Sequence, residues 1–534
     1  MGNNFYNTGT LLKLILRRER LNSTVWIVLV AGFVSLIAAA MRVAIDEASL
    51  LEMLHLLNNL AMIAMMGPII GGDTPTFGAV YTISMLLFTA IAVVVMNVML
   101  VVRHTRADEE KGRYEVVRSL PTGRLAHLHA TMIAAILINI LLSVLTGLGL
   151  YLLGDESMTF NGSMLWGALL GSVGLVFAAI AAVFSQLSAN SKGATGYSLF
   201  VMGAFYMLRA IGDVSVEALS LISPLGIILR GEPYAGNYWW PVFVLLILFI
   251  PIALLAYRLN LIRDIDQGLL PDKQGRAEGG RLLTSSFGLA FKLTKTGLIV
   301  GFITIFAIGA SYGTVMADIE GFLEANEFYQ QLILWMDGIS MPLLFAGMIN
   351  FMGAMMALIP MIIYLMKSRS EEKDIRAELI LATPVCRHKY LGSFVLISFA
   401  SSVVLQFLTA LGLWITTVSV IDDPSEFPFD TVVLSNLIYL PAIWVILGLG
   451  VLLIGWLPKA TSLIWAAYGF VFLIGMFGRM DLFPGWIIDI SPFGHVAQYP
   501  MEEISWVSLA VLTGIAVALT LLGFIGFRRR DVKA

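Results

Sequence analysis

Residues Glu109–Pro121 read EEKGRYEVVRSLP, and residues Glu371–Pro384 read EEKDIRAELILATP. Both stretches are dense in charge, although the chain of 534 residues is 58% hydrophobic and only 13% charged. Four residues in or just after the first stretch recur 263 positions later: Arg113, Glu115, Pro121 and Arg124 are matched by Arg376, Glu378, Pro384 and Arg387. The two Glu-Glu-Lys runs are 262 positions apart, which indicates one inserted residue. The chain therefore reads as an internal duplication.

Other echoes occur in the same order along the chain. Ile222–Gly226 reads ISPLG, and Ile490–Gly494 reads ISPFG. Short amphipathic stretches around Lys13 and Lys292 precede the first long apolar segment of each copy. We call these stretches connecting helices, because each leads from a polar segment into the first apolar one. Chance could supply any one echo, but together they support a repeat that covers most of the chain.

The repeat predicts two halves of six spans, residues 1–257 and residues 296–534. A polar cytoplasmic linker, residues 258–295, joins them and includes the second connecting helix. Because six is an even number, both halves enter the membrane from the same side. They are therefore expected to be parallel repeats, related by an axis along the membrane normal.

The mean hydropathy of +0.86 is too high for a water-soluble globular domain. A membrane-spanning helix needs about 20 apolar residues, and twelve segments qualify. The predicted fold is therefore an all-α polytopic membrane protein with twelve transmembrane helices. The expected spans are Thr24–Met41, Ala79–Val102, Thr131–Leu153, Met164–Phe184, Tyr197–Ile211, Pro241–Tyr257, Leu298–Met316, Pro342–Met366, Leu391–Ile421, Val432–Gly455, Ser462–Gly478 and Val507–Phe527. The apolar gaps Leu54–Ile70, Leu219–Leu229 and Phe483–Ile490 are candidates for short re-entrant or interfacial helices.

The distribution of basic residues predicts the orientation. If the amino terminus is cytoplasmic, only four of the 33 Lys and Arg fall at or beyond the outer face: Arg42, Arg209, Arg230 and Arg479. Cytoplasmic loops retain Lys and Arg, so both termini are expected to be cytoplasmic. The single Cys386 excludes an internal disulfide.

Each charged stretch then falls in a cytoplasmic loop, between the second and third spans of its half. Two apolar stripes are expected to rest on the helix bundle: Val116, Val117 and Leu120, and in the second copy Ile375, Leu379 and Ala382. A short amphipathic helix of this kind can offer its charged face to a soluble partner. The alternative is a solvated loop between helices, which the appearance of two copies at matched places makes less favoured.

The pattern Glu-Glu-x-Gly-Arg-x-Glu, followed by Pro and Arg, resembles the coupling-helix loop of ATP-binding-cassette exporter permeases of the second bacterial type. The segments Arg263–Pro271 and Leu208–Asp213 are similar to a narrower branch, the fused twelve-span exporters of the polyketide-antibiotic or tetronasin type. The second copy departs from the pattern, with Asp374 where Gly is usual and Ile375 after it.

The resemblance implies a permease subunit of the bacterial plasma membrane that exports lipophilic antibiotic-like or drug molecules. It implies a cytoplasmic ATPase dimer as partner, and that dimer would bind ATP and Mg²⁺. Membrane lipids are the other expected partners, and nucleic acid is not one. The residues expected to couple the permease to the ATPase are Glu109, Glu110, Arg113, Glu115, Pro121, Arg124, Glu371, Glu372, Arg376, Glu378, Pro384 and Arg387.

The chain itself lacks the sequence signature of an ATPase. A phosphate-binding loop reads G-x-x-x-x-G-K-[ST], and no such string occurs. We therefore expect a transport subunit without its own cofactor, not an enzyme. A polytopic membrane enzyme would need clustered acids, a metal triad or a nucleophile beside a base, and none is evident.

A secondary drug carrier is the natural alternative for twelve spans. Such carriers usually hold titratable residues inside their spans, but the twelve predicted spans contain no Asp, Glu, Lys or His. Polar residues such as Asn97, Asn139, Asn350 and Asn436 are better explained as hydrogen bonds between helices. A permease of the same class for a lipid or glycan is the other alternative.

The route of the cargo is predicted from aromatic, Met and Arg residues on three spans, the fifth, eighth and eleventh. Arg209 and Arg479 end the fifth and eleventh spans, where they either attract an acidic lipophilic substrate or pair with Asp213 and Asp481. The aromatic and Met residues either line an adaptable apolar route or pack the bundle. No metal site is expected. The candidate path residues are Phe200, Phe205, Tyr206, Arg209, Met348, Met352, Phe470, Phe472 and Arg479.

Overall fold

The computed structural model is helical throughout the residues that it describes. These are residues 4–44, 50, 53–54, 57–58, 60–69, 71, 76–264, 267–270, 278–314, 316, 340–421, 423–478 and 484–531. Within them, 11 helices are long and apolar enough to cross a membrane, and a shorter apolar helix covers Leu463–Met476. The shorter helix corresponds to the predicted eleventh span. The prediction of an all-α polytopic membrane protein is confirmed.

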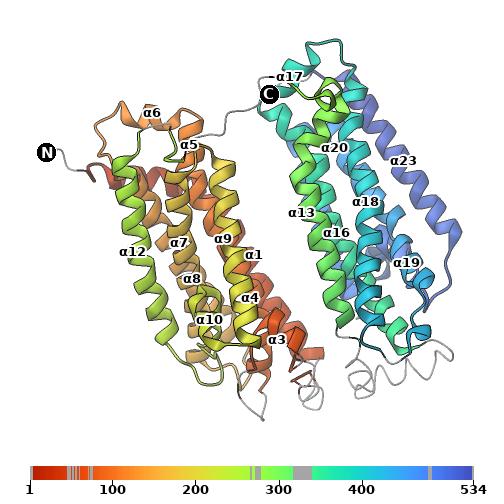
Figure 1. Cartoon of the computed structure of the whole chain (residues 1–534), viewed down its shortest axis with the longest axis horizontal. Coiled ribbons are helices and arrows are strands. Elements are labelled where there is room, and N and C mark those ends of the chain that lie inside the picture. Colours follow the sequence, from red (N-terminus) through yellow and green to blue (C-terminus); the bar gives the residue numbers. More distant parts are fainter. Residues whose placement is uncertain are drawn as a thin grey trace. The chain divides into compact units, whose positions relative to one another are not determined.

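Two compact units make up the chain, Met1–Gln274 and Gly275–Ala534. The long helices of the first unit bundle with one another, and α8 is the most deeply buried of them (Figure 1). Short helices connect the long ones at both ends. In chain order the helices are α1 (Thr8–Ala44), α3 (Leu60–Met66), α4 (Phe77–Arg103), α5 (Arg106–Glu110), α6 (Arg113–Arg118), α7 (Ala126–Tyr151), α8 (Phe160–Leu187), α9 (Ser191–Val214), α10 (Glu217–Ile222), α11 (Pro224–Leu229) and α12 (Trp240–Ile262).

The second unit repeats this order of long and short helices. Its α13, α16, α18, α20, α21 and α23 take the places of α1, α4, α7, α8, α9 and α12. Corresponding helices also pack on corresponding neighbours, since α1 packs on α7 as α13 packs on α18. The helices are α13 (Ser286–Thr314), α16 (Met341–Lys373), α17 (Arg376–Leu381), α18 (Arg387–Val418), α19 (Phe429–Leu437), α20 (Leu440–Trp456), α21 (Leu463–Phe477), α22 (Gly485–Ile490) and α23 (Trp506–Arg529), with 3-10 turns at η1 (Arg281–Thr284), η3 (Pro424–Glu426), η4 (Pro458–Ala460) and η6 (Pro492–His495).

Glycine permits the closest of these helix contacts. A Cβ atom on Gly167 of α8 would lie 2.1 Å from the carbonyl oxygen of Ser143 on α7. A Cβ atom on Gly412 of α18 would lie 2.4 Å from the carbonyl oxygen of Phe306 on α13. Small residues at such positions let backbones approach where lipid provides no hydrophobic drive for helices to associate. The predicted polar contacts also form, since Asn97 and Asn139 exchange hydrogen bonds of 3.0 and 2.7 Å between α4 and α7.

Two predicted details differ from the structure. The connecting helices are not separate, because α1 and α13 each run unbroken from the amphipathic stretch into the span. No Gly or Pro interrupts the segment from Leu11 to Thr24, so nothing ends the helix there. The tenth span, in contrast, is divided into α19 and α20. Pro441, at the start of α20, lacks the N–H that a continuous helix would need.

The short helices between spans also form. α10 and α11 cover most of Leu219–Leu229, and α22 covers the described part of Phe483–Ile490. Of the first such gap, Leu54–Ile70, the structure describes α3 and its surroundings.

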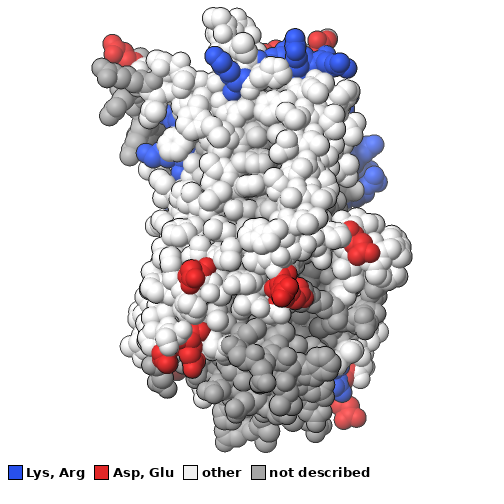
Figure 2. Space-filling view, turned by 90° about the vertical axis from the view of Figure 1, so that its right-hand side faces the viewer, with Lys and Arg blue, Asp and Glu red and all other residues white. Residues whose placement is uncertain are grey.

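Each unit has its charged loop and its chain terminus at the same end. In the first unit the backbone N–H groups of Gly123 and Leu125 donate to the carbonyls of Tyr6 and Asn4. In the second, Arg387 donates to the carbonyl oxygen of Arg528. On the face drawn in Figure 2, Lys and Arg gather mostly toward the end that carries α17, Asp and Glu mostly toward the opposite end, and a wide belt between them is uncharged.

Candidate coupling site

The first charged stretch folds as two short helices with a sharp corner between them. α5 ends at Glu110, and α6 begins at Arg113 after Gly112, whose φ is +67°. Glycine suits this left-handed conformation because it has no Cβ to clash with the following carbonyl. We call α5, α6 and the turn between them the first coupling corner.

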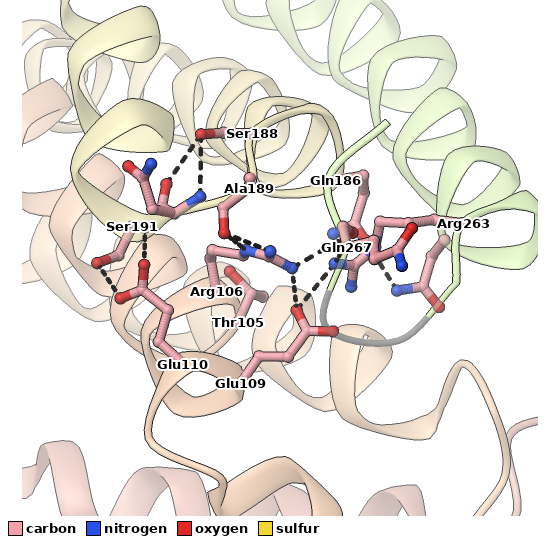
Figure 3. Close-up of polar contacts among 12 residues, drawn as sticks. Thr105, Arg106, Glu109, Glu110, Gln186, Ser188, Ala189, Ser191, Arg263 and Gln267 are labelled. Carbon is pink, nitrogen blue, oxygen red and sulfur yellow. Dashed lines mark hydrogen bonds and ion pairs between the residues drawn. The ribbon is translucent and has the colours of Figure 1, made fainter. Parts of the chain in front are cut away.

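A buried ion-pair cluster holds the first coupling corner to two other parts of the unit (Figure 3). The Glu109 carboxylate accepts from Arg106 at 2.8 Å and from Arg263, just beyond α12, at 2.9 Å. All three side chains are less than a tenth exposed. Nε of Arg106 also donates to the carbonyl oxygen of Ala189, in the loop between α8 and α9, at 2.9 Å. One carboxylate therefore joins the corner, the last span and the loop before the fifth span.

Two further contacts strengthen this arrangement. Glu110 accepts from the backbone N–H and from Oγ of Ser191, both at 2.6 Å, so its carboxylate sits at the amino-terminal end of α9. Arg124, which precedes α7, donates to the carbonyl oxygens of Arg263 at 2.8 Å and of Asn260 at 3.3 Å. Arg124 thus satisfies backbone acceptors at the end of the last span.

The long helix α1 is also tied to the first coupling corner. Arg18 makes a two-pronged pair with Asp108, with distances of 2.7 and 2.9 Å, and Arg113 reaches the same carboxylate at 3.1 Å. The next residue of α1, Glu19, pairs with Arg103 at 2.9 Å. Val117 of α6 packs on the cluster formed between α1 and α7.

The second coupling corner, Ser368–Leu381, has the same core contacts. The Glu372 carboxylate accepts from Arg369 at 3.0 Å and from Arg530, just beyond α23, at 2.8 Å. Nε of Arg369 donates to the carbonyl oxygen of Pro458, in the loop between α20 and α21, at 2.9 Å. Arg387 reaches the carbonyl oxygens of Arg528 and Arg530. Every contact has its equivalent in the first unit.

These contacts correct the alignment of the two copies. Glu109 corresponds in its partners to Glu372, and Asp108, which pairs with Arg113, corresponds to Glu371, which pairs with Arg376 at 2.7 Å. The offset is therefore 263 across the whole corner. The prediction of an inserted residue, which rested on the Glu-Glu-Lys runs, is wrong. Gly112 likewise corresponds to Ile375, not Asp374, and Ile375 has a φ of +63°. The hydrogen bond from Arg376 to Glu371 raises the pKa of the Arg376 guanidinium.

The faces of the two short helices differ in part from the prediction: Val117 packs inward as expected, but its neighbours in the predicted stripe do not. Val116 and Leu120 are 67% and 59% exposed, and Leu379 is 73% exposed. The residues that turn inward are Tyr114 on α6 and Ala377 on α17, at equivalent positions. Burial raises the pKa of the Tyr114 phenol. Glu115 and Glu378 lie beside the exposed apolar residues and are exposed themselves.

The twelve predicted coupling residues thus fall into two groups. Glu109, Glu110, Arg124, Glu371, Glu372, Arg376 and Arg387 have partners inside their own unit, and so does Arg113. Glu115, Glu378 and Pro384 lie on the exposed surface of the corners. Pro121 is exposed too, and its carbonyl oxygen accepts from Nδ2 of Asn7 at 2.8 Å.

The sequence interpretation missed four Arg residues of the buried clusters: Arg106, Arg263, Arg369 and Arg530. Arg106 and Arg369 could have been predicted from the sequence, because they obey the same offset of 263 positions as the matched motif. Arg263 and Arg530 could not, because their offset is 267 and they lie more than 150 positions from their carboxylates. Only the fold brings the last span beside the corner.

The described candidate path residues differ in their surroundings within each unit, and their role stays a prediction. Phe200 is 75% exposed on α9, whereas Phe205 and Tyr206 pack against the core of the first unit. In the second unit Met352 and Phe472 pack against the core, and Phe470 is 37% exposed. Met348 lies on α16, and Arg479 lies outside the described residues.

Arg209 is buried in a network at the end of the first unit opposite the corner. It pairs with Asp213 at 3.3 Å, and Asp213 also pairs with Arg230 at 3.3 Å. Its guanidinium donates to the carbonyl oxygen of Met65 at 3.2 Å and lies 4.7 Å from the ring centroid of Tyr206. In this structure Arg209 therefore holds α9 against the segment around α3.

Known proteins match the sequence of both units. A family model described as "Multidrug efflux system permease Rv1217c, C-terminal domain" matches residues 10–258 and residues 283–528, one segment in each unit. The multidrug efflux system permease protein Rv1217c of Mycobacterium tuberculosis is 32% identical over 537 residues, which cover 100% of this chain and 96% of that protein. The chain belongs to the family of the multidrug efflux system permease Rv1217c.

Proposed function

We propose that this chain is the membrane-spanning permease subunit of an ATP-driven exporter of the ATP-binding-cassette class. It would move lipophilic antibiotic-like or drug molecules out of the cell, across the bacterial plasma membrane. The relative from Mycobacterium tuberculosis is named a permease of a multidrug efflux system, which supports this function. The resemblance of the charged loops to coupling helices supports the class, and that of Arg263–Pro271 supports the tetronasin-type branch.

The observation that carries the proposal is the exposed tip of each coupling corner. Val116 and Leu379 stand out from their helices at 67% and 73% exposure, each beside an exposed carboxylate. Apolar residues that remain exposed on a short, firmly anchored helix are typical of a surface that a partner covers. Two such tips, one in each unit, fit a dimeric partner with one binding surface for each.

The partner that we propose for the two exposed tips is a cytoplasmic ATPase dimer. It would bind ATP and Mg²⁺, and the permease would supply the route without catalytic residues of its own. In this proposal the corner end of each unit faces the cytoplasm. Both termini would then be cytoplasmic, because the chain begins and ends at the corner ends of the units. Lys and Arg at that end agree with the retention of basic residues on the cytoplasmic side.

Reversal of the charge at both tips tests the proposal. The double variant Glu115→Arg with Glu378→Arg should insert into the membrane normally but lose copurification with the ATPase. It should also lose ATP-dependent efflux of ethidium from cells or from inverted vesicles. Glu156→Arg with Glu426→Arg provides the matched control, because both residues are exposed at the opposite ends of their units. Full ethidium efflux by the tip variant would disprove the docking assignment.

The rival function is a secondary carrier driven by an ion gradient. Among the described residues, the buried carboxylates Glu19, Asp108, Glu109, Glu371 and Glu372 lie at the corner ends of the units and are ion-paired there. Asp213 is held between two guanidinium groups. Vesicles that contain this chain alone decide between the functions. If they pump ethidium on a proton or sodium gradient without nucleotide, the secondary carrier is correct.

A further inference from the structure

Each unit contains one buried Arg–Glu–Arg triad, which joins three parts of the unit that are distant in sequence. We call Arg106, Glu109 and Arg263 the first triad, and Arg369, Glu372 and Arg530 the second triad. In both, the carboxylate lies at the corner and one Arg lies just beyond the last span. The other Arg binds the carbonyl of Ala189 or Pro458, in the loop before the fifth span.

The two units serve as a comparison within one chain, because they derive from the same pattern and have diverged around the triads. Tyr114 is replaced by Ala377, and Glu110 by Lys373. Gly112 is replaced by Ile375, although the backbone keeps its left-handed turn. The packing has therefore changed while the six charged residues and their partners have not.

Stability alone does not account for this retention. Removing one carboxylate and two guanidinium groups from water is costly, and well-packed apolar residues of similar volume often serve stability as well or better. What charged, hydrogen-bonded groups add is geometry, because a guanidinium fork fixes both the distance and the direction of its acceptors. A role that needs three parts held in one fixed arrangement would preserve such groups.

We propose that the two triads transmit the movement of each coupling corner to the last span and to the fifth span of the same unit. The inference rests on the proposed function, since the movement comes from an ATPase at α6 and α17. When the corner shifts, its Glu carboxylate pulls Arg263 or Arg530, and with it the end of α12 or α23. Arg106 or Arg369 lies on the same helix as that Glu, moves with it, and pulls the loop that begins α9 or α21. Glu109 and Glu372 are thus positioning residues that touch neither nucleotide nor cargo.

A second link in each unit also connects to the end of the last span. Arg124 and Arg387 bind backbone carbonyls beside the triad Arg of the last span. They bring the start of the third span into the same rigid assembly. A corner that moves by itself would have to break these bonds and leave buried charges without partners, which is strongly unfavourable.

The test uses the full chain with the ATPase that copurifies with it, reconstituted together in nanodiscs and in vesicles. In the variant Glu109→Gln with Glu372→Gln, affinity for the ATPase and the KM for ATP should not change, because the exposed tips are intact. The kcat for ATP hydrolysis stimulated by ethidium, and the rate of ethidium efflux, should each fall about tenfold or more, the size of a typical coupling between sites.

A compensated variant separates transmission from stability. Adding Arg263→Gln and Arg530→Gln to the two Glu→Gln changes restores the original net charge of each cluster, so the apparent melting temperature should recover. Efflux should stay low, because the link to the last span is still absent. If efflux recovers together with the melting temperature, the triads serve stability only and the inference is wrong.

Asp155→Asn is the matched control. Asp155 is a buried carboxylate that pairs with Arg42 at 2.5 Å, at the end of the first unit opposite the corner. Its loss should lower the melting temperature and leave coupling as it was. If the Glu→Gln variant couples normally while the tip variant Glu115→Arg with Glu378→Arg does not, only the triad inference fails. If the wild-type chain neither binds an ATPase nor needs ATP, the proposed function fails instead.

Discussion

The first and second coupling corners share the contacts of their buried triads but differ in packing. In the first, a Tyr ring at position 114 turns inward from α6 and meets His127 edge to face, with ring centroids 5.4 Å apart. In the second, the equivalent positions are Ala377 and Tyr390, so the ring comes from α18. The comparison indicates that apolar contacts at the corner are exchangeable between elements, whereas the ion pairs of the triads are kept.

The corners also differ in how they are tied to the first helix of their unit. Asp108 is held by Arg18 of α1. Its equivalent Glu371 is held by Lys367 of its own helix, at 3.0 Å. A salt bridge within one helix does not restrain a neighbouring helix. The first corner is therefore attached to α1 by charge, and the described contacts of Glu371 do not attach the second to α13.

The largest expected effect comes from exchanging the buried ring. Tyr114→Ala should destabilise the first corner by about 3 kcal/mol, the cost of removing a large buried aromatic side chain. A cavity of about 20 Å³ already lies beside Tyr114 and His127. Adding His127→Tyr rebuilds the arrangement of the second unit, so part of the loss should return. Hydrogen exchange of residues 106–118 measures both effects.

The reverse exchange is the control for this comparison. Ala377→Tyr should be destabilising while Tyr390 is present, because two rings would compete for one space. If His127→Tyr restores nothing to the Tyr114→Ala variant, the two corners are not interchangeable in packing.

A smaller effect is expected at the turn of each corner. Ile375 holds a left-handed φ that costs a residue with a Cβ roughly 1–2 kcal/mol, and its side chain is 55% exposed. Ile375→Gly should therefore stabilise the second corner, by about 1 kcal/mol or less after the larger chain entropy of glycine is counted. Gly112→Ile should destabilise the first. Apparent melting temperatures and hydrogen exchange of residues 369–381 test both; a loss of stability in Ile375→Gly would contradict the argument.

Hydropathy and the internal repeat predicted most of the fold, because long apolar segments in lipid can satisfy their backbone only as helices. The ends of helices were predicted less well. The absence of Gly and Pro from Leu11 to Thr24, which lets α1 run on, and Pro441, which divides the tenth span, were both visible in the sequence but not used.

Short helices form in both charged stretches, as the sequence predicted, but the faces that they bury were only partly predicted. In a six-residue helix such as α6, three apolar residues do not determine a face. The interpretation put Val116 and Leu120 against the bundle because apolar residues are usually buried, and it overlooked Tyr114. Val116 and Leu120 are exposed and do not follow that rule. The triads could not be predicted in full, because Arg263 and Arg530 reach their carboxylates only through the fold.

The smallest expected effect is at Glu110, which has no acidic equivalent in the second unit. Its carboxylate accepts two hydrogen bonds from Ser191 at the start of α9, and it is exposed (Figure 3). Glu110→Lys, which copies Lys373, removes both bonds and places positive charge at a helix amino terminus. We expect a loss of about 0.5–1 kcal/mol, screened by salt. Hydrogen exchange should become faster only in residues 188–194. The difference from the wild type should shrink at high ionic strength. Glu115→Lys, five residues along, should leave that segment unchanged; an equal effect there would show that net charge, not the cap, is responsible.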